Sequence, residues 1–168
     1  HGFPRENRPG PALVEAAAKA GALGVFGAAG LSLPRVTAAI DRLSTSLAGQ
    51  PWAINLIHSP DDQRLEAALV ELFLARRVPV VSASAYPDLT LPVVKWRVAG
   101  IHTNEQGRIV ANPLIAKVSR AEVAKKFLEA PPERFLTELV KSGFITAQQA
   151  ELAARIPMAD DVTAEADS

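Results

Sequence analysis

The sequence predicts an α/β fold in which parallel β-strands alternate with helices. Short β-rich runs alternate with amphipathic helical stretches over the first 160 residues, a pattern typical of βα units. Several predicted strands are apolar on both faces, as strands of a doubly covered parallel sheet are. The composition, with 48% hydrophobic residues, 21% charged residues and no cysteine, indicates one globular domain. It excludes disulfide scaffolds and thiolate metal sites.

The chain begins with a helix, a strand and a second helix. Pro11 can open a helix and Gly21 suits its left-handed C-terminal cap, which predicts a helix over residues 11–20. Residues 23–26 are the first predicted strand. After Pro34, apolar residues recur at helical spacing and predict a helix that packs on a sheet: Val36, Ile40, Leu43 and Leu47.

Two apolar strands flank the next helix. Residues 52–57 are the second predicted strand, and residues 78–84 are the third. The helix between them runs from Ser59 to about Arg77. Its start combines a capping serine, a first-turn proline and two carboxylates, Asp61 and Asp62. Its predicted buried face consists of Leu65, Ala68, Leu69, Leu72 and Phe73.

A less regular stretch follows. A helix is expected over residues 90–99, then a turn at residues 104–107, and a strand over residues 108–118 that bends near Pro113. A capping box in SRAE, with Ser119 as the cap, predicts a helix to about Glu129.

The alternation is interrupted by a helical insertion over residues 131–156. Two helices follow each other there without a strand between them, and Thr146 caps the second. The last segment, DDVTAEADS at residues 160–168, is predicted to be a strand. The chain thus has about five βα units, whereas a closed eight-fold barrel takes roughly 250 residues. Because proteins avoid exposed apolar edge strands, the sequence predicts part of a larger barrel.

Polar residues interrupt the apolar strands near their carboxyl ends. The residues concerned are Asn55 with His58, Ser82 with Ser84, Lys117, and Glu165 with Asp167. Each has an ordinary structural explanation alone, such as a satisfied core amide. The carboxyl ends of parallel strands form the binding face of such folds. The recurrence of polar residues at these ends therefore predicts a binding site for a polar ligand.

Other patterns exclude functions or leave them open. Glycines recur at positions 21, 24, 27 and 30, which matches neither a dinucleotide fingerprint nor a P-loop. They fit a helix cap and tight turns, or a turn that lets backbone approach a flat ligand. The paired carboxylates at 61–62 and 160–161 are expected to complement helix dipoles or face solvent, so no metal site is predicted.

Charge and hydropathy argue against nucleic acids and membranes as partners. The 18 basic residues balance the 18 acidic ones and aromatics make up 5%, which argues against a nucleic-acid binder. No apolar stretch reaches the roughly 20 residues of a membrane span. The N-terminus lacks a signal core and an initiator methionine, so a cytoplasmic chain that is processed or part of a longer protein is expected.

Five strings give the chain a family resemblance: VFGAAGLSL, NLIHSPDD, VSASAYPDLT, RIVANPLIAKVSRAEVAKKFLEAPPERFL and IPMADDVTAEADS. They resemble the trans-acting, FMN-dependent enoyl reductases of polyketide and polyunsaturated fatty acid synthases, relatives of nitronate monooxygenases. The resemblance implies a TIM (β/α)8 barrel with FMN at its carboxyl-end mouth, and a lid-like insertion at residues 131–156. It also implies that residues 1–168 are the N-terminal part of that barrel and need its C-terminal half to hold FMN tightly.

The resemblance assigns roles to individual residues. Asn55 is expected to contact the flavin ring or its ribityl chain. Lys117 is expected to lie near the pyrimidine side of the ring, where a cation stabilises negative charge. Ser82 and Ser84 would face the same ring, Glu165 and Asp167 would also bind the cofactor, and His58 would lie near the substrate thioester as a catalytic residue.

The implied reaction is the reduction of an enoyl thioester on an acyl carrier protein, with NAD(P)H as the source of hydride and FMN as its carrier. Two alternatives remain open. One is a nitronate monooxygenase-like flavin oxidase, and the other is a non-catalytic half-barrel that docks a partner.

Overall fold

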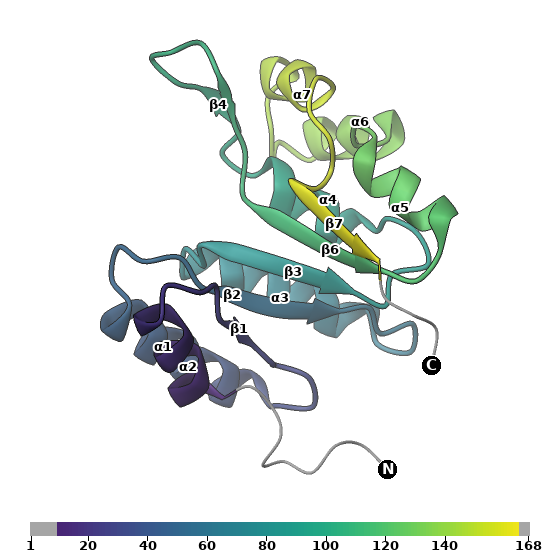
Figure 1. Cartoon of the computed structure of the whole chain (residues 1–168). Helices are drawn as coiled ribbons and strands as arrows, with labels where there is room; N and C mark the ends of the chain where they lie inside the picture. The colour runs from purple at the N-terminus through teal and green to yellow at the C-terminus, as the bar shows by residue number, and fades with distance from the viewer. Residues whose placement is uncertain (1–9, 165–168) are drawn as a thin grey trace.

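The computed structural model describes residues 10–164, and its centre is a sheet of five parallel strands (Figure 1). Their order in space follows their order in the chain. They are β1 (Val25–Phe26), β2 (Ala53–Ile57), β3 (Val80–Ser84), β6 (Leu114–Val118) and β7 (Asp161–Ala164). The predicted class, an α/β fold with parallel strands alternating with helices, is confirmed.

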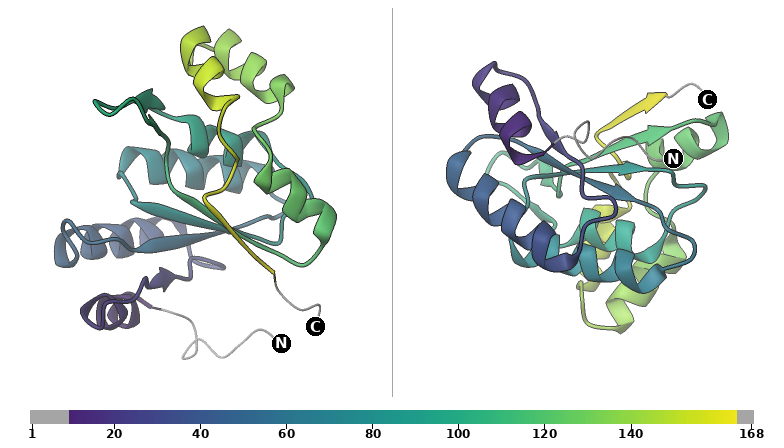
Figure 2. Two further views of the ribbon diagram at one scale, coloured as in Figure 1. Left: turned by 45° about the horizontal axis from the view of Figure 1, so that its top comes forward. Right: turned by 90° about the horizontal axis from the view of Figure 1, so that it is seen from below.

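Seven helices accompany these strands within the described residues. They are α1 (Pro11–Lys19), α2 (Leu33–Ser46), α3 (Gln63–Ala75), α4 (Leu91–Val98), α5 (Ala121–Leu128), α6 (Glu133–Lys141) and α7 (Ala147–Ala153). Helices α3 and α4 lie behind the sheet in Figure 1, and the view from below in Figure 2 separates them from the strands. As predicted, α6 and α7 follow α5 without an intervening strand.

The core lies between the sheet and the helices. Strand side chains point alternately to the two faces of a sheet. One alternating set is at most 1% exposed and packs beneath the helices: Ile54, Leu56, Val81, Ala83, Leu114 and Ala116. The intervening residues of β2, β3 and β6 therefore lie on the opposite face.

A two-stranded antiparallel hairpin interrupts the alternation after α4. Strand β4 (His102–Thr103) pairs with β5 (Ile109–Val110), and the predicted turn at residues 104–107 joins them. The side chain of Asn104 closes this turn by accepting hydrogen bonds from the backbone N–H groups of Gln106 and Arg108. Pro113 follows the hairpin, so the predicted break near this residue is confirmed and separates β5 from β6.

The helix caps correct two predictions. Helix α3 is capped by Asp62 and not by Ser59, because the Asp62 carboxylate accepts from the Leu65 N–H at 3.0 Å. The N-cap of α5 is Arg120 without a side-chain bond, so the predicted Ser119 capping box is wrong. The predicted cap of α7 is confirmed, since Thr146 and Gln149 form a reciprocal capping box.

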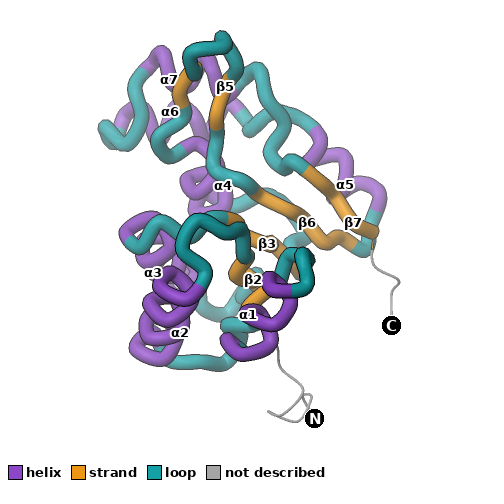
Figure 3. Tube along the Cα trace, turned by 60° about the vertical axis from the view of Figure 1, so that its left-hand side comes forward, coloured by secondary structure: helices purple, strands orange, loops and turns teal. Residues whose placement is uncertain are grey.

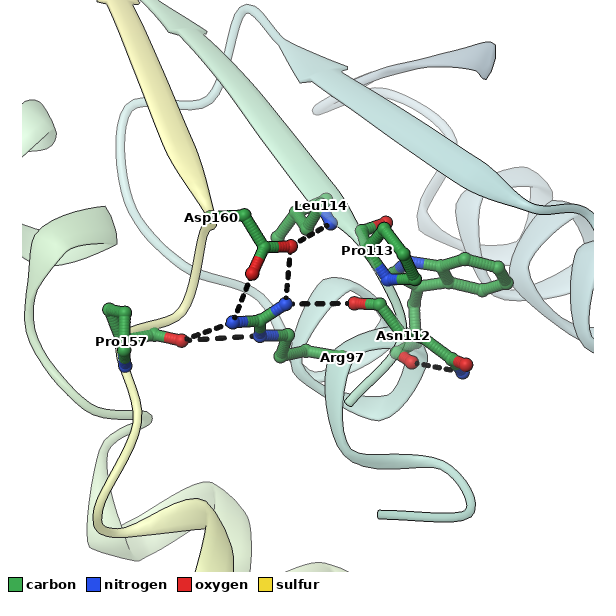
Figure 4. A network of polar contacts seen from close by, with 7 residues as sticks. Arg97, Asn112, Pro113, Leu114, Pro157 and Asp160 are labelled. Atoms are coloured by element: carbon green, nitrogen blue, oxygen red, sulfur yellow. Dashed lines mark hydrogen bonds and ion pairs between the residues drawn. The ribbon is translucent and has the colours of Figure 1, made fainter. Parts of the chain in front are cut away.

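A buried guanidinium joins α4 to the amino ends of β6 and β7 (Figure 4). Arg97, which is 3% exposed, donates to both Asp160 carboxylate oxygens at 2.8 and 3.1 Å. It also donates to the carbonyl oxygens of Asn112 and Pro157. Asp160 was expected to face solvent or complement a dipole. It does face solvent in part, and it also neutralises the buried guanidinium and accepts from the Leu114 N–H.

The glycines at 21 and 24 have structural roles. Gly21 adopts φ = 81° directly after the C-cap of α1, which is the expected left-handed cap. At Gly24 a Cβ would lie 2.8 Å from the Val14 Cα, so only glycine allows α1 to approach β1 this closely. Within residues 10–164, no helix is both long and apolar enough to cross a membrane.

Candidate functional site

Three predicted site residues meet on the face of the sheet opposite the helix-covered core. Ser84 at the end of β3 is in register with Lys117 of β6 and with Ile57 of β2. Asn55 lies two residues before Ile57 and therefore on the same face. The Ser84 hydroxyl donates to the Asn55 side-chain oxygen at 3.3 Å. The predicted convergence of these strand ends is thus present.

These residues line a cleft of about 520 Å³. The other walls come from the loop at residues 85–87, from residues 118–120 after β6, and from Glu122 and Val123 of α5. The cleft lies at the carboxyl ends of the parallel strands, where α/β folds bind their ligands. Its volume is that of a small-molecule site.

Lys117 places a cation on the floor of this cleft, and Arg120, which also lines it, pairs with Glu122 at 3.7 Å. Lys117 is half-buried, and no hydrogen bond or ion pair joins its ammonium to another residue of the part that the structure describes. Burying a charge without a partner is costly. Lys117 is therefore suited to an anionic or electron-rich ligand.

Ser82 lies beneath the cleft rather than in its wall. It is in register with Asn55 and is 1% exposed, and its Oγ has no hydrogen-bond partner within the described chain. Buried hydroxyls in folded proteins are almost always hydrogen-bonded. This orphaned hydroxyl on the cleft side of the sheet is a second indication that the site takes a ligand.

His58 does not line the cleft. Its backbone N–H donates to the Ser84 carbonyl oxygen, which ties the ends of β2 and β3 together. Its ring lies 5.1 Å from the Tyr86 ring, centroid to centroid, and its Nδ1 is 3.5 Å from Glu66 Oε2. The structure thus sets His58 behind Tyr86. Glu165 and Asp167 lie outside the described residues.

Sequence reasoning missed Glu66 and Tyr86. Glu66 is 5% exposed, and its carboxylate accepts from the Tyr86 hydroxyl at 2.9 Å and the Thr90 hydroxyl at 2.7 Å. Burial is the largest cause that raises the pKa of Tyr86, and the charge and hydrogen bond of Glu66 raise it further. The buried residues of α3 are Glu66, Val70 and Phe73, so the predicted face is correct at Phe73, and its Leu69 and Leu72 are partly buried against the core. The helical spacing of Glu66 with two apolar residues signals a buried carboxylate, but it does not identify Tyr86 as its partner.

Two of the paired carboxylates have structural partners. In residues 10–164, no three histidine, aspartate or glutamate side chains are grouped as metal ligands. Asp62 caps a helix and Asp160 pairs with Arg97. Both carboxylates thus have structural roles.

Sequence comparison finds relatives in two biosynthetic systems. The chain is 49% identical over 157 residues to one of the polyunsaturated fatty acid synthase subunits of Thraustochytrium sp.. It is 41% identical over 158 residues to the polyketide biosynthesis protein PksE of Bacillus subtilis. Each match covers 93% of this chain, but only 10% of the synthase protein and 21% of PksE. No family model matches the sequence.

A solved structure is similar over almost the entire fold. It is the enoyl reductase domain of MlnA from the macrolactin biosynthesis cluster of Bacillus amyloliquefaciens, with a TM-score of 0.89 and 35% identity. The match covers 95% of this chain and 37% of that one. The five-stranded parallel sheet is thus consistent with part of an α/β barrel. The predicted resemblance to the enoyl reductases of polyketide and polyunsaturated fatty acid synthases is therefore confirmed.

Proposed function

We propose that this chain contributes the FMN-binding cleft of an enoyl reductase that acts in trans on enoyl thioesters of an acyl carrier protein. The strongest support comes from three residues that line one cleft at the carboxyl ends of the strands: Asn55, Ser84 and Lys117. The relatives belong to polyketide and polyunsaturated fatty acid biosynthesis, and the similar structure is an enoyl reductase domain.

The residues of the cleft fit a flavin. Ser82 offers a buried hydroxyl without a partner among the described residues, and Asn55 offers an amide on the same face. Lys117 offers a cation that no described residue neutralises. When bound, FMN supplies the hydride-transfer chemistry between NAD(P)H and the enoyl thioester.

Each residue then has a role of its own. Lys117 would hold a positive charge at the bound cofactor, which is electrostatic stabilisation by a fixed group. Asn55 and Ser84 orient the ring or its ribityl chain through hydrogen bonds, and their mutual bond fixes both side chains. Glu165 and Asp167 remain proposed cofactor-binding positions. His58, set back from the cleft, is better suited to orienting Tyr86 than to touching the thioester.

The remaining assignments concern partners. The C-terminal half of the barrel is proposed as the partner that completes the FMN site. Helices α6 and α7 lie at the end of the molecule that carries the hairpin (Figure 3) and contribute no residue to the lining of the cleft, so this structure does not place the expected lid-like insertion over the cleft.

The first test replaces Lys117 with methionine in the holoenzyme. We expect Lys117→Met to weaken FMN binding about tenfold or to slow flavin reduction by a similar factor, because one charge interaction is lost. FMN titration and stopped-flow reduction by NADPH measure the two quantities. Lys125→Met is the matched control, because Lys125 on α5 is 79% exposed and pairs only weakly with Glu129.

Unchanged FMN affinity and unchanged reduction rate would remove Lys117 from the site. The same holoenzyme, assayed with crotonyl thioester and with a nitroalkane, separates the proposed reaction from the oxidase alternative. Nitroalkane oxidation without thioester reduction would contradict the proposal. A holoenzyme that binds no FMN would favour the docking role.

A further inference from the structure

Glu66 is a buried carboxylate that the proposed reaction does not use. It lies in the first turn of α3, where the helix dipole favours negative charge. Within the described residues, no lysine or arginine pairs with it. Its partners are the hydroxyls of Tyr86 and Thr90, and the His58 ring at 3.5 Å.

The two hydroxyls belong to one loop, residues 85–90, which connects β3 to α4 and forms part of the cleft wall. The loop begins with Ala85 at φ = 63°, a left-handed conformation that a non-glycine residue adopts only under constraint. Asp88 of the same loop pairs with Lys126 of α5 at 3.0 Å. The loop is therefore held by α3 from one side and by α5 from the other.

The bond to Glu66 determines which part of Tyr86 faces the cleft. A tyrosine hydroxyl has one hydrogen to donate, and here Glu66 receives it. Tyr86 lines the cleft whereas Glu66 does not. The hydroxyl thus points away from the cleft, and the ring forms the wall. The edge-to-face contact of this ring with Phe127 supports the same orientation.

We propose that Glu66 is a positioning residue of the cleft: its carboxylate holds the Tyr86 hydroxyl toward α3 and so presents the Tyr86 ring to the ligand. The identity of that ligand rests on the proposed function, but the positioning does not.

The test uses the fact that Tyr86 is the single tyrosine of the chain. Its phenol ionisation can be followed by absorbance at about 295 nm without interference from another tyrosine. In the wild-type chain we expect no ionisation before alkaline unfolding. In Glu66→Gln burial still raises the pKa of the phenol, but the charge of Glu66 no longer adds to it, so we expect the ionisation to begin at a lower pH than in the wild type while circular dichroism still reports a folded chain.

The matched control is Glu71→Gln. Glu71 lies on the same helix, but it is 59% exposed and pairs with Lys95 at the surface. Its substitution should leave the tyrosine titration as in the wild type. A folded Glu66→Gln chain whose Tyr86 hydroxyl proton exchanges with water as slowly as that of the wild type would overturn the proposal. So would a folded wild-type chain whose tyrosine ionises near its ordinary value of about 10.

If Glu66→Gln does not fold, the wild-type chain alone still tests the proposed hydrogen bond between Tyr86 and Glu66. The hydroxyl proton of Tyr86 should then be visible by NMR and protected from exchange with water. Its absence from the spectrum would contradict the hydrogen bond to Glu66.

A double-mutant cycle in the holoenzyme measures the effect on the ligand. Glu66→Gln should weaken FMN binding about tenfold, since a charge-assisted hydrogen bond that orients the Tyr86 ring is lost. The same change in a Tyr86→Phe background should have much less effect. An equal effect in both backgrounds would overturn positioning through the hydroxyl. A holoenzyme without thioester reduction would refute the proposed function and leave the tyrosine titration to decide the role of Glu66.

Discussion

At the carboxyl end of α3, Arg77 adopts φ = 54°, a conformation that disfavours any side chain with a Cβ. The Val78 N–H bonds to the Phe73 carbonyl oxygen at 3.0 Å, which makes Arg77 the left-handed residue of a Schellman motif. Glycine is the usual residue there, and Arg77 is exposed.

We therefore expect Arg77→Gly to raise the free energy of unfolding by about 0.5–1 kcal/mol, because the relief of strain exceeds the entropy cost of glycine. Urea unfolding followed by circular dichroism measures the change. Arg64→Gly is the control, since Arg64 is also exposed, lies in the first turn of the same helix with ordinary helical backbone, and should lose up to about 1 kcal/mol. A lower midpoint for Arg77→Gly would contradict the strain argument.

The residues of the cleft show how far sequence reasoning reaches. Asn55, Ser84 and Lys117 could be placed together because parallel strands bring their carboxyl ends to one edge. Glu66 and Tyr86 could not, because their contact depends on how α3 packs against a loop that begins in a left-handed conformation. Hydrophobic periodicity carries no information about that geometry.

Among the elements, the connection between α4 and the amino end of β7 depends on the Arg97–Asp160 pair (Figure 4). The guanidinium is 3% exposed, whereas the Asp160 side chain is 54% exposed. Removing the carboxylate leaves a buried cation with carbonyl partners alone, which costs more than the loss of a surface pair.

We expect Asp160→Asn to lower the free energy of unfolding by about 1.5–3 kcal/mol, the range for losing a hydrogen bond to a charged group. Asp161→Asn, the same change at the exposed neighbouring residue, should cost less than about 0.5 kcal/mol. Thermal unfolding of the two variants side by side measures the difference. Equal losses would show that the Arg97 pair contributes no specific stability.

The elements themselves were largely predictable, and their ends were not. Each of the five parallel strands lies inside a predicted strand, and for β2 and β3 the signal was the apolar run that burial between layers requires. The caps at Ser59 and Ser119 were misplaced since several polar residues compete for each position, and only the backbone geometry decides among them. Strand β4 escaped prediction because two residues, His102 and Thr103, carry no detectable periodicity.

For the whole molecule, the buried tyrosine couples alkaline pH to unfolding. Because the folded-state pKa of Tyr86 is raised, its contribution to stability is complete below the unfolded pKa of about 10. Above that pH only the unfolded chain releases the proton, so stability falls as the pH rises.

The expected loss relative to Tyr86→Phe is about 1.4 kcal/mol for each pH unit above 10, which corresponds to one proton. Urea unfolding of both proteins between pH 9 and about 11 measures this slope and cancels the titration of the lysines that they share. Parallel stability curves would show that the Tyr86 phenol ionises equally well in the folded chain.

The two ends of the sheet carry different features. The carboxyl ends carry the cleft, whereas the amino ends carry the Arg97 pair and the β4–β5 hairpin (Figure 1). In barrels of this class the first end determines chemistry and the second determines stability.

The hairpin turn at residues 104–107 lies at the end of the sheet that does not carry the cleft, and this has a practical use. It is largely exposed, closed by its own asparagine and directed away from the cleft. An epitope or a fluorophore inserted between Glu105 and Gln106 would therefore be tolerated, giving a handle for immobilisation or imaging that leaves ligand access untouched.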